Sequence, residues 1–103
     1  MNENTEQLRS LFQRIPRRHT ADNVKEINNI LEAYEDLLQN LEADNRYEKQ
    51  VAPFFEALDP IRDTIKQSNS NKASKKGKDD LFDEASGALK DTMEELMQLL
   101  ATS

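Results

Sequence analysis

The chain has 103 residues, no cysteine, and nearly as many charged residues (33%) as hydrophobic ones (36%). The lack of cysteine excludes disulfides, a thiolate nucleophile and cysteine-ligated metals, and the composition leaves little material for a large core. The net charge of −6 disfavours nucleic acid as a partner. No stretch approaches the roughly 20 apolar residues of a membrane span, and the N-terminus lacks the apolar run of a secretory signal. We therefore expect a single cytoplasmic domain over residues 1–103.

The first predicted helix covers about residues 4–15. Its apolar residues recur at the i, i+3, i+4 and i+7 spacing of one helix face: Leu8, Leu11, Phe12 and Ile15. Pro16 should end this helix, because the residue before a proline is pushed out of the helical region.

The second predicted helix, about residues 20–43, carries the strongest pattern in the chain. Thr20 is suited to cap its N-terminus. Apolar residues then alternate in steps of three and four, which is typical of a heptad seam, and Ile30 and Leu37 widen that seam. The seam consists of Val24, Ile27, Leu31, Tyr34, Leu38 and Leu41.

The third predicted helix covers about residues 47–67, after a turn at 43–46 that Asp44 favours. Its stripe consists of Tyr47, Val51, Phe54, Leu58, Ile61 and Ile65. Pro53 and Pro60 lie inside it, and a proline within a helix removes a hydrogen bond. We expect a kinked or segmented helix, with Asp59 and Pro60 as the cap and first position of a restart.

Residues 68–79 are polar and basic and offer nothing large to bury, so we predict a flexible linker. The fourth predicted helix covers about residues 80–101. Its apolar face consists of Leu81, Phe82, Ala85, Leu89, Met93, Leu96, Met97 and Leu100. Small residues cluster at 85–88, and we expect Gly87 to admit a closely approaching neighbour.

These four segments predict an all-α fold. We expect an antiparallel bundle of three long helices and a short N-terminal helix, with seams like those of coiled coils. Because the linker is long, the last helix could instead lie on a partner chain, as in helix-in-groove recognition.

Two basic clusters interrupt the acidic sequence. Arg14, Arg17 and Arg18 form a possible contact patch beside Pro16, and four lysines lie within residues 72–78. No aromatic residues are interleaved for base stacking, so we expect these cations to pair with acidic helices.

Paired carboxylates are the main candidates for chemistry. Glu32 and Glu35 are followed about twenty residues later by Glu56 and Asp59. This spacing loosely resembles the metal motif of the all-helical nucleotide pyrophosphohydrolases, EExxE followed by ExxD, and the resemblance would imply a Mg²⁺-dependent enzyme. Leu31 stands where that motif has its first acid. We expect these acids to form a solvated helix face and the chain to bind no metal or cofactor.

The sequence shows no phosphate-binding loop and no nucleophile with an adjacent base. We therefore predict a non-enzymatic protein-interaction module, such as an adaptor, assembly subunit, chaperone-like factor or inhibitor. Its partner would be another protein or further copies of the chain. The expected contact residues are Leu31, Leu38, Leu89, Met93, Leu96, Met97 and Leu100. The alternatives are an acidic mimic that blocks a DNA- or RNA-binding protein, and the Mg²⁺-dependent enzyme.

Overall fold

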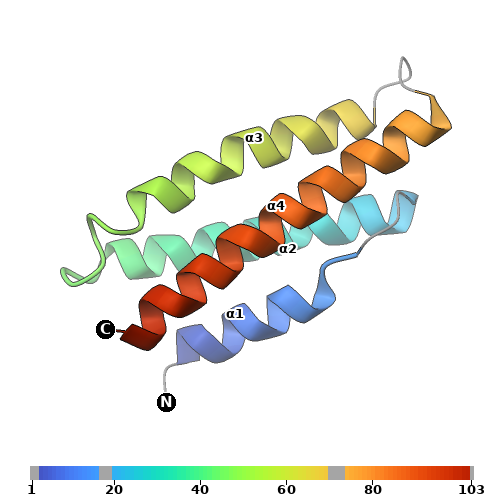
Figure 1. Ribbon diagram of the computed structural model, residues 1–103. Helices are drawn as coiled ribbons and strands as arrows, with labels where there is room; N and C mark the ends of the chain where they lie inside the picture. Colours follow the sequence, from blue (N-terminus) through green and yellow to red (C-terminus); the bar gives the residue numbers. More distant parts are fainter. Residues whose placement is uncertain (1–2, 17–19, 70–73, 103) are drawn as a thin grey trace.

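The structure is a computed structural model that describes residues 3–16, 20–69 and 74–102. Those residues form four helices and no strand (Figure 1). The helices are α1 (Glu3–Arg14), α2 (Ala21–Glu42), α3 (Ala52–Ser68) and α4 (Lys75–Thr102). The prediction of an all-helical chain is therefore confirmed for this part of the sequence.

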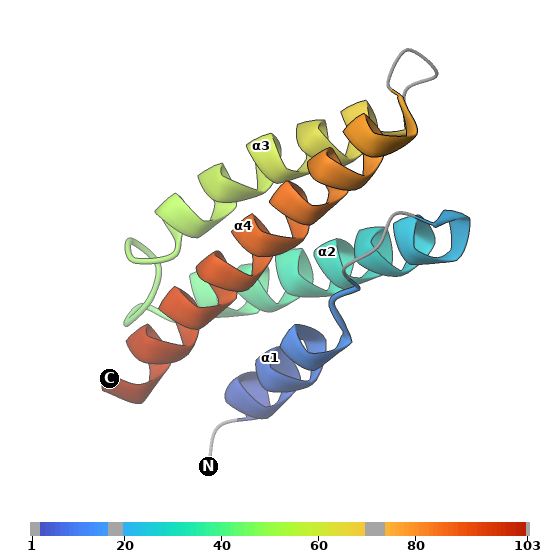
Figure 2. The same ribbon diagram turned by 45° about the vertical axis from the view of Figure 1, so that its right-hand side comes forward.

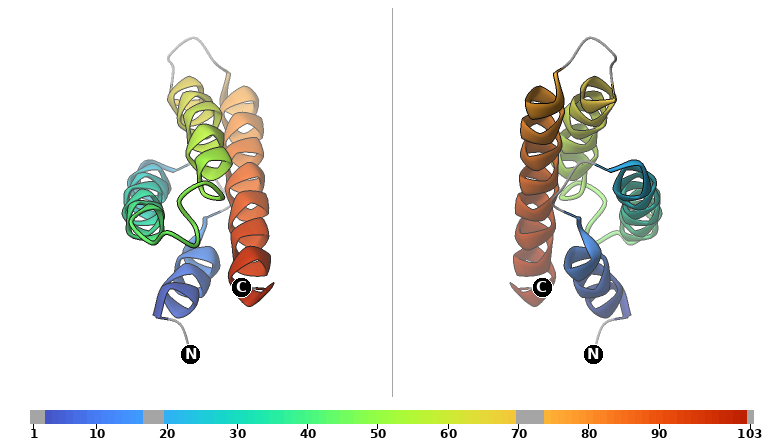
Figure 3. Two further views of the ribbon diagram at one scale, coloured as in Figure 1. Left: turned by 90° about the vertical axis from the view of Figure 1, so that its left-hand side faces the viewer. Right: turned by 90° about the vertical axis from the view of Figure 1, so that its right-hand side faces the viewer.

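The helices pack mainly in the pairs α1–α2, α2–α3, α3–α4 and α1–α4. Helices α3 and α4 form the most extensive of these pairs and lie side by side (Figures 1 and 2). The short helix α1 lies beside the C-terminal half of α4, so the start of α1 and the end of α4 are at the same end of the molecule (Figure 3). The described part of the molecule is elongated, with extents of 44 × 22 × 18 Å.

The predicted apolar stripes form the core. On α2, all six seam residues and both flanking residues, Ile30 and Leu37, are buried. Because α2 is apolar over such a broad face, it can contact more than one neighbour. Its Tyr34 crosses the core, and the Tyr34 hydroxyl lies 3.2 Å from Oγ1 of Thr92 on α4. The cap at the start of α2 is also confirmed, since Thr20 Oγ1 accepts a hydrogen bond from the Asn23 amide at 3.0 Å.

The third helix begins later than predicted. Residues 43–51 form turns, and α3 starts at Ala52. Asp44 stabilises the turn as expected, because its Oδ1 accepts the Arg46 amide at 2.9 Å. Tyr47 and Val51 are still buried, so turns outside a continuous helix can also place stripe residues in the core. Pro53 lies in the first turn of α3, where its missing N–H costs no helical hydrogen bond.

The predicted restart at Pro60 is wrong. Helix α3 continues from Ala52 to Ser68 with Pro60 inside it. Pro60 and Glu56 are both exposed, so the hydrogen bond that the proline removes lies on the side where water can replace it. Thr64 Oγ1 donates a hydrogen bond to the Pro60 carbonyl at 2.8 Å. This bond adds a side-chain contact within the same turn of the helix.

The fourth helix begins earlier than predicted. Residues 75–79 are helical and do not belong to a linker, and Ser68 is the last residue of α3. The cause is Ser74, whose Oγ accepts the Gly77 amide at 3.0 Å and caps the helix. The centre of the predicted linker, residues 70–73, lies outside the described residues.

Candidate functional site

The residues predicted to contact a partner lie in the chain's own core. Met97 is half-buried, and the others are buried: Leu31, Leu38, Leu89, Met93, Leu96 and Leu100. Helix α4 thus packs against its own chain. A partner could reach these side chains only if α4 moved away, so docking of residues 80–101 on another protein stays a prediction.

The first basic cluster is partly used within the chain. The Arg14 guanidinium pairs with Glu26 Oε1, at 2.5 Å from Nη2 and 3.1 Å from Nε. This pair joins the end of α1 to the first turns of α2. Arg17 and Arg18 lie outside the described residues, so the predicted contact patch stays a prediction.

Three of the four carboxylates in the predicted acidic pairs line one hollow. Glu35 of α2 and Glu56 and Asp59 of α3 surround a space of about 310 Å³ that also contains Arg62. The Arg62 guanidinium forms an ion pair with Glu35. Glu32 is exposed and does not line this hollow. Within residues 3–16, 20–69 and 74–102, no group of three or more His, Asp or Glu side chains is placed to hold a metal ion.

A different surface, between α3 and α4, combines an apolar floor with carboxylates that form no ion pair among the described residues. Two hollows of about 260 and 270 Å³ follow one another along these helices and share Ala57 and Ala88. We call this surface the α3–α4 groove. It is lined from α3 by Pro53, Phe54, Ala57, Pro60, Ile61 and Thr64, and from α4 by Glu84, Ala85, Ala88, Asp91, Thr92 and Glu95.

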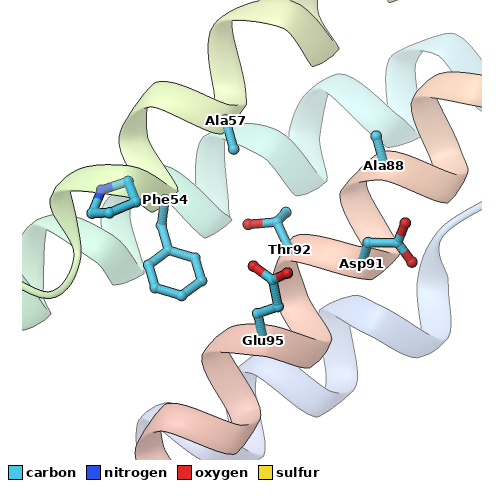
Figure 4. A pocket seen from close by; sticks show the side chains of 7 residues that line it. Phe54, Ala57, Ala88, Asp91, Thr92 and Glu95 are labelled. Carbon is cyan, nitrogen blue, oxygen red and sulfur yellow. The ribbon is translucent and has the colours of Figure 1, made fainter.

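Small side chains make the groove. Ala57 on α3 and Ala88 on α4 leave space between the helices, while Phe54 closes one end beside Thr92 and Glu95 (Figure 4). The cluster of small residues predicted at 85–88 thus contributes to a surface feature. The expectation that Gly87 admits a closely approaching neighbour is wrong, however, because a Cβ added there would meet nothing within 4 Å.

The groove floor is tied to the core. Thr92 is buried, and its hydroxyl forms the hydrogen bond with Tyr34. Burial raises the pKa of Tyr34 to about 12, and the carboxylate of Glu95 adds to that increase against the opposing effect of the Thr92 hydrogen bond. Nearby, Ser86 is also buried and donates to the Pro16 carbonyl at 2.8 Å. Helix α4 is therefore held by polar contacts to α2 and to the segment after α1.

The charges of the groove all lie on one edge. Glu84, Asp91 and Glu95 are exposed along α4, and the residues that α3 contributes are uncharged. Between described residues, ion pairs link α1 to α2 and α2 to α3, but none links α3 to α4. Three carboxylates consequently face solvent beside an apolar trough, and no ion pair with another described residue neutralises them.

Sequence reasoning found only part of this groove. The small cluster on α4 was visible, and Ala88 belongs to it. The contribution of α3 was missed, although Pro53, Ala57, Pro60 and Thr64 recur at steps of four, three and four. That spacing marks a helix face without charge, and the signal was hidden by the expectation that the prolines would break the helix.

None of the described helices is both long and apolar enough to cross a membrane. Comparison of the chain with protein-family models, with curated proteins and with solved structures finds no match.

Proposed function

We propose that this chain is a non-enzymatic protein-binding module that receives its partner in the α3–α4 groove. One observation carries the proposal: an apolar trough lies open between the two most extensively packed helices, and its acidic edge has no cation among the described residues. Open apolar surface next to polar rims is typical of protein interaction sites.

The same proposal includes the finer architecture. We infer an antiparallel bundle in which α2, α3 and α4 are the long helices and α1 covers one end. The support is the closed series of helix pairs together with the buried seam of α2. Such a scaffold would present the groove as a rigid surface, because each of its two helices is held on its other side by core contacts.

The Mg²⁺-dependent enzyme receives no support from the geometry around its candidate acids. Arg62 supplies the positive charge that a divalent cation would have to supply beside Glu35. A cation there would be repelled by the guanidinium. The acidic mimic is likewise less favoured, since the unpaired acids border an apolar trough and do not form an isolated row.

Site-specific photo-crosslinking tests the proposal. A benzoylphenylalanine is placed at Pro60, an exposed position on the α3 wall of the groove, or, as the control, at Glu32 on the exposed side of α2. In cells that produce the protein, we expect a discrete protein adduct from position 60, which mass spectrometry then identifies, and none from position 32. Equal labelling from both positions, or no adduct from position 60, would refute the groove as a binding site.

Self-association is a separate outcome of the same test. An adduct between two copies of the chain would show that the module forms homo-oligomers through the groove. Sedimentation velocity over a range of concentrations distinguishes this outcome, because a self-associating chain sediments faster as its concentration rises.

A further inference from the structure

We propose that the occupant of the α3–α4 groove is a single amphipathic helix of another protein, with lysine or arginine along one edge. This inference rests on the proposed function and adds the chemistry of the partner. It follows from the shape of the groove, the hydrogen bonding of its walls and the position of its charges.

The shape of the groove suits a rod. The two hollows are continuous through Ala57 and Ala88. The carboxylates that border them extend from Glu84 to Glu95, which at about 1.5 Å per helical residue is roughly 16 Å. A guest helix of about three turns matches that length. Its large apolar side chains would fill the two hollows, where α3 and α4 present mainly small ones.

The walls of the groove favour a helical guest over an extended one. Both walls are helices, so their backbone groups are already paired within each helix, and the groove offers no sheet edge to which a strand could be added. A guest in this trough must therefore satisfy its own backbone hydrogen bonds, as a helix does.

The acidic residues beside the groove require one basic edge on the guest helix. On α4, Glu84, Asp91 and Glu95 stand at positions i, i+7 and i+11, which lie on one face of a helix. The opposite wall, from Pro53 to Thr64, contributes no charged side chain to the groove. A neutral or acidic guest would cover these carboxylates without pairing them, which is costly. Lysine or arginine on the side of the guest that faces α4 removes that cost.

The guest is expected to come from another protein and not from a second copy. The apolar stripes of α1, α2, α3 and α4 are all packed into the core of this chain. The described part of the chain thus has no free amphipathic helix to donate. A second copy could insert one only by unfolding part of its own core.

Binding of a synthetic peptide tests this inference. The probe is a fluorescein-labelled helical peptide of leucine and lysine with all lysines on one face, followed by fluorescence anisotropy at low salt. The test variant is Glu84→Gln/Asp91→Asn/Glu95→Gln. The matched control is Glu32→Gln/Asp36→Asn/Glu42→Gln, which changes the net charge equally at three exposed positions of α2.

We expect the groove variant to bind the probe at least about tenfold more weakly than the unmodified chain, because close charge pairs at an interface contribute strongly to affinity. The control should change affinity by less than about twofold, as expected for charges remote from the contact. Equal weakening by the two variants would show non-specific attraction to an acidic protein and would overturn the inference.

A second pair of variants tests the apolar part of the groove. Ala88→Trp fills the trough, and Ala21→Trp adds the same ring at an exposed position of α2. We expect Ala88→Trp to weaken binding at least about tenfold, by steric exclusion of anchor side chains, and Ala21→Trp to leave it unchanged. Circular dichroism melting checks that both variants are folded. Unchanged binding by folded Ala88→Trp would also overturn the inference.

These outcomes separate the two proposals. If crosslinking at position 60 captures a partner segment that is not a basic helix, the identity of the guest is wrong while the binding function stands. If the peptide binds as expected but position 60 gives no adduct in cells, the binding function is wrong while the chemistry of the groove stands.

Discussion

The hollow between α2 and α3 and the α3–α4 groove differ in how their carboxylates are paired. Between α2 and α3, the acids Glu35, Glu56 and Asp59 line a hollow with Arg62, and the Arg62 guanidinium pairs with Glu35. Between α3 and α4, three acids on α4 face a wall without charge. Arg62 offsets one of the three carboxylates of the α2–α3 hollow, whereas no ion pair among the described residues involves the three acids of the α3–α4 groove. The contrast therefore lies in Glu35, whose ion pair joins α2 to α3, while no described ion pair joins α3 to α4.

The largest expected effect distinguishes the two faces of α4. Met93 is fully buried, while Asp91 is exposed on the groove edge. We expect Met93→Ala to lower the free energy of unfolding by about 2–5 kcal/mol, because it leaves a cavity in the core. Asp91→Ala should change it by less than about 0.5 kcal/mol. Urea denaturation followed by circular dichroism measures both. A small effect of Met93→Ala would mean that α4 does not pack on its own chain in solution.

The next effect concerns the link between the groove floor and the core. Tyr34 has a pKa of about 12, raised by burial from the usual value of 10.0. The unfolded chain loses the phenolic proton first, so stability is complete below pH 10 and is lost as the pH rises from 10 to about 12. We expect this loss to reach about 2–3 kcal/mol.

The control for that pH dependence is Tyr34→Phe. This variant should be less stable at neutral pH by about 1 kcal/mol, because the hydrogen bond to Thr92 is removed. It should also lack the part of the alkaline loss that Tyr34 causes, leaving the contribution of other groups. Urea denaturation at a series of pH values compares the two chains. Identical alkaline profiles would show that Tyr34 is not protected from solvent.

A smaller and opposite effect is expected beside the groove. Gly87 is exposed in the middle of α4, and a Cβ there would meet open space. Gly87→Ala should therefore raise the free energy of unfolding by up to about 1 kcal/mol, through the higher helix propensity of alanine. The reverse change at the neighbouring position, Ala88→Gly, should lower it by a similar amount. A loss of stability in Gly87→Ala would reveal a close neighbour at this position.

Gly87 also illustrates which structural features could be predicted from the sequence and which could not. The helical stripes were predictable because burial of an apolar face determines them, and the seam of α2 was predicted residue by residue. The conformational effects of single residues were harder. Pro60 was expected to break a helix that continues, and Gly87 was expected to face a neighbour that is absent, because neither residue reveals which side of its helix faces solvent.

The candidate site was predictable only in fragments, for a related reason. A groove depends on which two helices lie side by side, and the periodicity of a single helix does not indicate its neighbour. The residues that α3 contributes, such as Ala57, acquire meaning only opposite Ala88. Similarly, the pairing of Glu35 with Arg62 joins positions 27 residues apart. A spacing pattern that suggested a metal site could not show that a guanidinium would pair with one of its acids.

The smallest expected effect concerns the Arg62–Glu35 ion pair and tests the difference between the α2–α3 hollow and the α3–α4 groove. Arg62→Met removes the cation from the α2–α3 hollow, and we expect a loss of stability below about 1 kcal/mol, because the Arg62–Glu35 pair is partly exposed and weakened by solvent. Added salt should reduce the difference. Adding Glu35→Gln to Arg62→Met should recover part of the loss, since it removes repulsion among the remaining acids.

In the α3–α4 groove, Asp91→Asn should cause no loss of stability, because that carboxylate has no ion-pair partner among the described residues. Urea denaturation of these variants at low and high salt measures the contrast, which would disappear if Arg62→Met and Asp91→Asn had the same effect.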